Sequence, residues 1–298
     1  MAPSTEVLTV TSLVFTIVVL GYASLLDWRT RRVRNPVWIA LSAAGLVFLA
    51  VRVFIEKQPI EYLLISLPIL AILADVYLDP DSGGPVARAH PALKYGAAIA
   101  MTVAMALVWH DSQYFLHLLT IPVFMILVVL MYALDVIRGG ADAKALLSLA
   151  IMFPFLPEVG GLPILIPEYW FTGVMFPFTL VVLIDAAILV AVLPIAFLVR
   201  NILSRELLFP QSFLGYKKDI DNTRDSYVWL MERIENGGRV VYSKPRRNED
   251  LGAELDRFAE IGVDRVWVTP KIPFIVPIFF SVILTTVIGN LLLLIMGT

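Results

Sequence analysis

The stretch VLTVTSLVFTIVVLGYASLLDWRTRRVR, residues 7–34, decides the fold. Its first 20 positions, Val7–Leu26, carry no charge, and a helix needs about 20 apolar residues to cross the hydrocarbon core of a bilayer. The run begins close to the first residue, but no basic stretch and no small-residue cleavage site accompany it. We therefore expect a retained membrane span rather than a signal peptide.

The composition of the whole chain agrees with this first span. Apolar residues make up 59% of the 298 residues and charged ones 16%, whereas a soluble domain carries about 25% charged residues. Long uncharged runs predict seven further spans, at about 36–55, 60–78, 93–109, 114–137, 143–158, 169–199 and 273–296. The expected fold class is an α-helical polytopic membrane protein with about eight transmembrane helices.

One polar block interrupts the apolar pattern between the last two spans. Within residues 204–270 we expect a helix at Tyr227–Glu235, a strand at Arg239–Tyr242, a helix at Glu249–Ile261 and a strand at Arg265–Val268. This is a small cytosolic α/β insert. The expected domains are therefore residues 1–203 with seven transmembrane helices, residues 204–270, and residues 271–298 with the last helix.

Basic residues set the expected orientation. Arg29, Arg31, Arg32 and Arg34 follow the first span, which puts that end in the cytoplasm and the N-terminus outside. Alternation through eight spans then places all but two of the 23 Lys and Arg residues on the cytoplasmic side, the exceptions being Arg52 and Lys57. The chain is therefore expected in the cytoplasmic membrane, with the insert inside the cell.

Several kinds of site are excluded or disfavoured by composition. The chain has no cysteine, which excludes disulfides, cysteine-ligated metals and a thiol nucleophile. It has three widely spaced histidines and a net charge of −2, so we expect no metal site, no cofactor and no nucleic-acid partner.

Two carboxylates at span ends are the candidate catalytic groups. Asp27 ends the first span and Asp142 begins the sixth, and charged groups at such depths are usually functional. The topology puts both at the cytoplasmic membrane face. Two neighbouring carboxyls cannot both ionise, so such a pair shares one proton and can act as base and acid in amide hydrolysis.

Helix dipoles suggest a role for each acid. Asp142 lies at a helix N-terminus, which favours negative charge, and Asp27 lies near a helix C-terminus, which does not. We therefore expect Asp142 to be the base and Asp27 the acid. Taken singly, Asp142 could instead be a helix N-cap, and Asp27 could be an interfacial acid paired with Arg29 or Arg31.

Two glycines before Asp142 also fit proteolysis. Gly139 and Gly140 lack a Cβ, so a substrate backbone can approach closely and the loop can flex. An ordinary turn between helices is the alternative explanation.

Other acids remain open as secondary candidates. Asp185 lies in the middle of the seventh span, either hydrogen-bonded inside the bundle or holding an ion in a secondary transporter. Asp135 precedes Asp142 by two helical turns and is a second choice for catalysis. Acids at the cytoplasmic face could balance Arg88 and Arg138, or could receive the basic leader that the resemblance described next implies; these are Asp75, Asp79, Asp81 and Asp135.

Three segments resemble prepilin and preflagellin peptidases. Asp27–Pro36, with sequence DWRTRRVRNP, resembles the first catalytic segment of that family. Gly139-Gly140-Ala141-Asp142 is similar to its second motif, Gly-x-Gly-Asp or Gly-x-hydrophobic-Asp, with Ala141 matching the archaeal form. Trp267–Pro277, with sequence WVTPKIPFIVP, resembles the start of the last helix in the archaeal enzymes.

The resemblance implies a membrane aspartyl endopeptidase of the GxGD class. Such an enzyme removes a short basic leader from preflagellin (archaellin) or type IV pilin-like precursors, so a precursor protein and membrane lipid are the implied partners; the oligomeric state stays undefined. The resemblance implies a protease core of six helices, whereas eight spans are expected here. The third and fourth spans therefore look like an insertion into that core. The cysteine pairs of many bacterial members are absent, which favours the archaeal type and gives no support for a methyltransferase activity.

Overall fold

The chain folds into two compact units. The computed structural model describes residues 3–78, 90–165, 170–235, 238–243 and 250–291. One unit comprises Met1–Ala187 together with Pro273–Thr298, and the other comprises Ile188–Ile272. The insert predicted at residues 204–270 lies within the second unit. Its exact boundaries stay a prediction.

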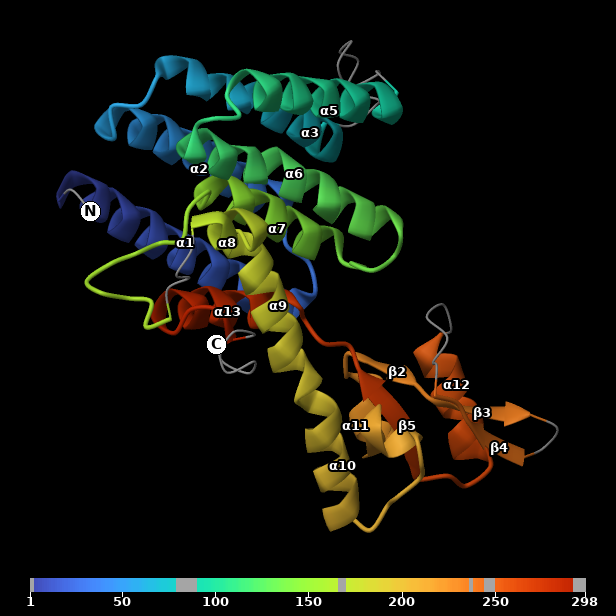
Figure 1. Ribbon diagram of the computed structural model, residues 1–298. Coiled ribbons are helices and arrows are strands. Elements are labelled where there is room, and N and C mark those ends of the chain that lie inside the picture. Colours follow the sequence, from blue (N-terminus) through green and yellow to red (C-terminus); the bar gives the residue numbers. More distant parts are fainter. Residues whose placement is uncertain (1–2, 79–89, 166–169, 236–237, 244–249, 292–298) are drawn as a thin grey trace. The chain divides into compact units, whose positions relative to one another are not determined.

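Helices account for nearly all of the first unit (Figure 1). Six helical stretches within the described residues are long and apolar enough to cross a membrane. They are α1 (Pro3–Thr30), α2 (Asn35–Ile55), η1 (Ile60–Ile65) continued by α3 (Ser66–Tyr77), α5 (Pro91–Val108), α6 (Gln113–Ala133), and α9 (Phe178–Ala191) continued by α10 (Leu193–Leu203). This confirms the expected polytopic helical fold.

Two of the eight predicted spans contain shorter helices. The sixth, expected at 143–158, forms α7 (Gly140–Met152), and the eighth forms α13 (Ile275–Val287), each with 13 residues. Pro154 explains why α7 ends early, because a proline disfavours helical geometry in the residue before it. A short helix α8 (Trp170–Met175) precedes α9.

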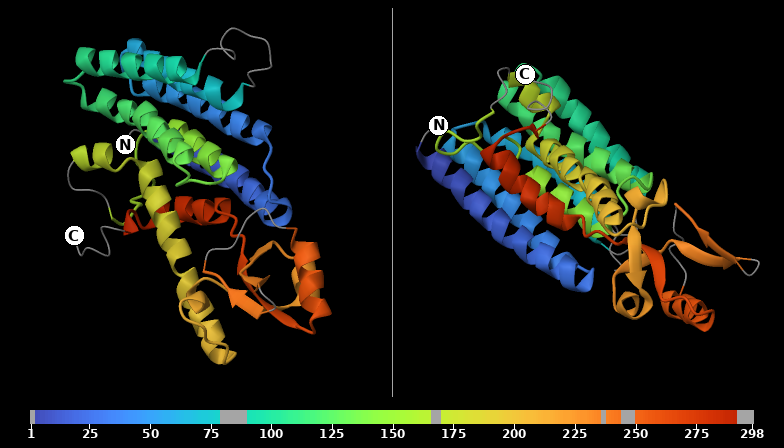
Figure 2. Two further views of the ribbon diagram at one scale, coloured as in Figure 1. Left: turned by 90° about the vertical axis from the view of Figure 1, so that its right-hand side faces the viewer. Right: turned by 90° about the horizontal axis from the view of Figure 1, so that it is seen from below.

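Helix α7 lies at the centre of the first unit and is buried on all sides. It contacts α2, α6 and α13, and Ala143 and the run from Ala145 to Met152 are buried. A Cβ on Gly45 would lie 3.0 Å from Ile151 Cγ2, so this glycine allows α2 to approach α7 closely. Helix α1 packs against α2 and α13 on one side, and α3 packs against α5 on the other (Figure 2).

The second unit is a small α/β fold. Strands β1 (Tyr216–Asp219), β5 (Arg265–Pro270) and β2 (Val228–Leu230) form an antiparallel sheet in the order β1-β5-β2, and β3 (Glu232–Glu235) pairs with β4 (Gly238–Val241). The other elements are η3 (Gln211–Phe213), α11 (Ile220–Arg224) and α12 (Leu251–Glu260). Its core consists of Ile220, Val228, Leu230, Leu255, Phe258, Val266 and Val268.

The sequence prediction for this unit was right in three elements and wrong in one. The strand at Arg239–Tyr242, the helix at Glu249–Ile261 and the strand at Arg265–Val268 correspond to β4, α12 and β5. Tyr227–Glu235 is not a helix but contains β2 and β3. Val228 and Leu230 are both buried, with the partly exposed Trp229 between them, and this alternation suits a strand that pairs with β5.

Candidate active site

Asp27 lies in the last turn of α1 and is buried against the start of α13. Its exposed fraction is 9%. Burial disfavours the charge on its carboxyl, whereas the charge of Arg31 and a hydrogen bond from the backbone N–H of Ile275 favour it. Ser24, one turn earlier in α1, donates its hydroxyl to the Ile275 carbonyl at 3.3 Å. The N–H and the carbonyl of Ile275, the first residue of α13, are therefore both hydrogen-bonded to side chains of α1. Asp27 lies at the N-terminus of α13.

Asp142 lies in the first turn of α7, folded back over the residue that caps that helix. Gly139 is the N-cap, and a Cβ on it would lie 2.1 Å from Asp142 Oδ2 and 2.7 Å from Asp142 Cγ. Only a glycine leaves this space free. A Cβ on Gly140, in contrast, would meet Tyr132 Oη at an ordinary 3.6 Å. Gly139 thus has a steric function that Gly140 does not share.

The structure brings these two acids together. The Asp142 carboxyl is affected first by its own burial and then by the charge of Asp27, although the two residues come from different helices. Helix α13 contacts both α1 and α7, and Lys144 Nζ donates to Asn35 Oδ1 at 2.8 Å, joining the start of α2 to the first turn of α7. The ends of these four helices therefore meet at one end of the bundle.

A polar network behind Asp142 was not foreseen from the sequence. The Ser148 hydroxyl on α7 is hydrogen-bonded to the Ser42 hydroxyl on α2, with 2.9 Å between the two Oγ atoms. Ser42 Oγ also lies 3.4 Å from the Tyr77 hydroxyl oxygen at the end of α3. The Lys144 ammonium lies 5.9 Å from the centre of the Tyr77 ring. These contacts fix α7 against α2 and α3. Isolated serines within apolar spans were the available signal.

The remaining candidate residues have other surroundings than this pair. Asp135 follows the end of α6, is exposed, and has a left-handed φ of 63°, so no helical face joins it to Asp142. Ala141 packs against the hydrophobic core. Asp185 is fully buried and accepts hydrogen bonds from Thr285 Oγ1 at 2.7 Å and from the Leu291 N–H at 3.3 Å. Asp185 is therefore hydrogen-bonded inside the bundle, one of its two expected states.

The acids considered for a basic substrate segment fall into two groups. Asp75 Oδ1 accepts from Lys94 Nζ at 3.0 Å, and Asp75 Oδ2 accepts from the Tyr95 hydroxyl at 2.6 Å. Its charge is thus already partnered between α3 and α5. Asp79 and Asp81 lie outside the described residues.

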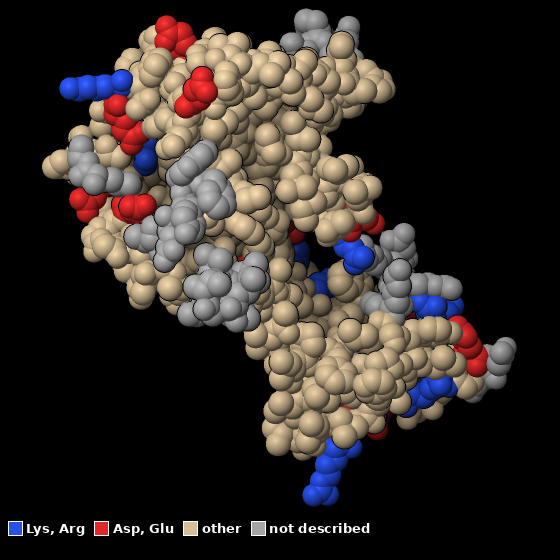
Figure 3. Space-filling view, in the orientation of Figure 1, with Lys and Arg blue, Asp and Glu red and all other residues tan. Residues whose placement is uncertain are grey.

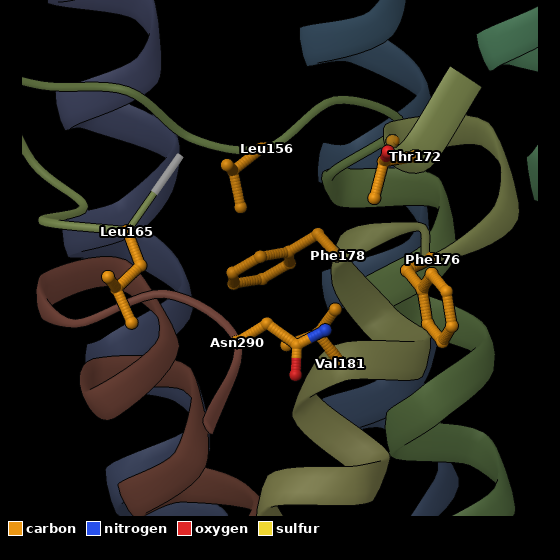
Figure 4. A pocket seen from close by; sticks show the side chains of 8 residues that line it. Leu156, Leu165, Thr172, Phe176, Phe178, Val181 and Asn290 are labelled. Atoms are coloured by element: carbon orange, nitrogen blue, oxygen red, sulfur yellow. The ribbon is translucent and has the colours of Figure 1, made fainter. Parts of the chain in front are cut away.

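A small cavity lies elsewhere in the first unit (Figure 4). Its volume is about 30 Å³, which is enough to hold a water molecule. Its lining is mostly apolar and contains neither Asp27 nor Asp142; it consists of Leu156, Leu165, Thr172, Gly173, Phe176, Phe178, Val181 and Asn290. Across the residues that the structure describes, no group of three or more His, Asp or Glu side chains could hold a metal ion.

Comparison with known proteins finds a peptidase family that is similar to the C-terminal part of the chain. Residues 208–291 match the family described as Archaeal Peptidase A24 C-terminus Type II. Over this range the chain is similar to that archaeal peptidase family. The matched range includes the segment Trp267–Pro277, one of the three on which the sequence resemblance rested.

The curated relatives of the chain are named as peptidases as well. The chain is 29% identical to the preflagellin peptidase of Methanocaldococcus jannaschii over 162 residues, covering 51% of this chain and 63% of the relative. It is also 29% identical to the preflagellin peptidase of Methanococcus voltae over 176 residues, covering 55% of this chain and 68% of the relative. The matches thus span roughly two thirds of these relatives and half of this chain.

Proposed function

We propose that the protein is a membrane aspartyl endopeptidase of the GxGD class, with Asp27 and Asp142 as its catalytic residues. The observation that carries this proposal is that α13 packs against both α1, which ends at Asp27, and α7, which begins at Asp142, so that the charge of Asp27 reaches the buried Asp142 carboxyl. The similarity of residues 208–291 to an archaeal peptidase family and of the chain to preflagellin peptidases supports peptidase chemistry, and an Asp pair that shares one proton can perform it.

The surroundings of the two acids favour a revised division of roles. The expectation that Asp142 is the base rested on its place at a helix N-terminus, but Asp27 also lies at one, that of α13. Burial disfavours the charged form of both acids. A nearby guanidinium and an N–H donor both stabilise a carboxylate anion, and within the part of the chain that the structure describes only Asp27 has these, from Arg31 and Ile275. We therefore propose that Asp27 holds the negative charge and Asp142 holds the shared proton.

Hydrolysis then follows from this arrangement. Asp27 takes a proton from a water molecule, and the water oxygen attacks the scissile carbonyl carbon. Asp142 donates a hydrogen bond to the carbonyl oxygen and stabilises the charge that develops there. Collapse of the tetrahedral intermediate breaks the C–N bond as a proton passes to the leaving nitrogen. The two carboxyls return to their starting state with one proton between them.

We propose that the substrate is a preflagellin or type IV pilin-like precursor with a short basic leader. The named function of the relatives supports this class. The leader would stay at the cytoplasmic face of the cell membrane, where the Lys and Arg distribution places this end of the bundle, and the apolar segment that follows it would enter the bilayer. Membrane lipid is therefore the second partner.

Cleavage of a precursor by purified variants tests this function. The protein is reconstituted in lipid with a precursor that bears a basic leader, and products are followed by gel and mass spectrometry. Asp27→Asn and Asp142→Asn should each abolish cleavage while the helical circular dichroism persists. Asp185→Asn and Asp135→Asn are the matched controls and should still cleave. Activity in both dyad variants, or its loss in Asp185→Asn alone, would refute the assignment.

A further inference from the structure

Helix α10 packs through one face only. On the packed face, the Phe197 ring lies 5.8 Å from the Tyr216 ring, and Asn201 Nδ2 donates to the Ser212 and Gly215 carbonyls at 3.0 and 2.7 Å. The opposite face is entirely apolar and exposed; it consists of Val192, Ile195, Val199, Ile202 and Leu203. The fold of the second unit therefore leaves a whole helix face uncovered.

The loop after α10 extends this apolar surface. Leu207 and Phe209 are 61% and 83% exposed, and Leu208 between them is also exposed. The loop is nevertheless well held, because the Leu208 N–H donates to Ser212 Oγ at 2.8 Å and the Glu206 N–H donates to the Asn201 carbonyl at 2.9 Å. Three consecutive large apolar side chains are thus presented outward by a defined loop. Such patches mark interaction sites.

The apolar face is continuous with a membrane span. Phe178–Leu203 forms one apolar stretch of 26 residues, while the hydrocarbon core requires about 20. The excess places the end of α10 at the lipid headgroups. Arg200 and Arg205 lie at this end, and the Arg200 guanidinium stacks 3.6 Å from the centre of the Tyr216 ring. Basic side chains at this level suit lipid phosphates.

The distribution of charged side chains on the surface agrees with an apolar face on α10 (Figure 3). Around the lower part of α10 the visible surface has few charged side chains, apart from a basic one at the tip. We propose that the outer face of α10 and the loop Leu203–Phe209 form a lipid-binding surface, through which the insert is held in the membrane. The occupant is bilayer lipid. This inference rests on the membrane span of α9 and α10 and is independent of the proteolytic function.

Site-directed fluorescence in the full chain tests the proposal. The protein has no cysteine, so single cysteines can be labelled without background. Leu203→Cys and Phe209→Cys carry an environment-sensitive dye, and the protein is reconstituted in phospholipid vesicles. Ile261→Cys, at the end of α12 in the same unit, is the matched control because Ile261 is also an exposed apolar residue, at 53%. Quenching is measured with nitroxide-bearing lipid and with aqueous iodide.

Three outcomes are distinguishable. The proposal predicts that the dyes at positions 203 and 209 are quenched several-fold more by nitroxide lipid than the dye at position 261, which iodide should quench instead. Equal iodide quenching at positions 209 and 261 would overturn it, because the loop would then lie in water. Protection of position 209 from both quenchers would also overturn it, because a protein would then cover the loop. Leader cleavage enters none of these readouts.

Discussion

Gly139→Ala is the substitution whose effect follows most directly from the geometry. The new Cβ would lie 2.1 Å from Asp142 Oδ2 and 2.7 Å from Asp142 Cγ, far inside van der Waals contact. The backbone φ of Gly139 is −94°, which alanine adopts without strain, so the backbone can remain in place. The Asp142 carboxyl must therefore move, by an ångström or more.

The expected loss of activity can be estimated from that displacement. A misplacement of about 1 Å can lower a rate by about 100-fold, which corresponds to about 2.7 kcal/mol of lost transition-state stabilisation. We therefore expect kcat/KM for leader cleavage to fall by about 100-fold in Gly139→Ala. Stability should fall by about 1 kcal/mol or less, the usual cost of a poorer N-cap residue.

Two glycine variants serve as controls in the same assay. Gly140→Ala places a Cβ 3.6 Å from Tyr132 Oη, and Gly96→Ala meets nothing within 4 Å. Cleavage by reconstituted protein and thermal unfolding are measured for all three variants. The loss should be largest for Gly139→Ala, smaller for Gly140→Ala and absent for Gly96→Ala. Full activity in Gly139→Ala, or an equal loss in Gly140→Ala, would refute the reasoning.

Three further predictions concern the proton, the packing and the buried acid. The pH–rate profile of cleavage should be bell-shaped, because one carboxyl must be ionised and the other protonated; a flat profile would contradict a shared proton. Gly45→Val should destabilise the bundle by about 1–3 kcal/mol in thermal unfolding, since even a Cβ would lie 3.0 Å from Ile151 Cγ2; unchanged stability would disprove this close contact. Thr285→Val should also destabilise, by about 1–3 kcal/mol, because Asp185 loses a hydroxyl donor, whereas Thr285→Ser should not. Cleavage should persist in both Thr285 variants, and its loss in Thr285→Val alone would implicate Asp185 in the reaction.

The sequence predicted the bundle well because the hydrocarbon core leaves few alternatives. An uncharged run such as Val7–Leu26 can form little except a spanning helix, and alternation of the spans then assigns Asp27 and Asp142 to one membrane face. The length of α7 was less predictable, since the buried run before Pro154 is short for a span.

Long-range contacts were beyond the sequence argument. The strand at Val228–Leu230 forms because it pairs with β5, and its local pattern was mistaken for a helix. The hydrogen bond from the Ile275 N–H to Asp27 depends on where α13 begins in space. The contact between Gly139 and the Asp142 carboxyl depends on a side-chain rotamer. Among these contacts, the one between Ile275 and Asp27 bears on the proposed roles of the two acids, which helix dipoles alone assigned the other way.

Cross-linking of the two acidic positions tests the central claim most directly. The chain has no cysteine, so Asp27→Cys/Asp142→Cys can be treated in membranes with a short bifunctional thiol reagent. Asn35→Cys/Lys144→Cys, whose native side chains are 2.8 Å apart, is the positive control. We predict an intramolecular cross-link in both double variants, detected by mass spectrometry. A cross-link between positions 35 and 144 but none between 27 and 142 would contradict the paired acids.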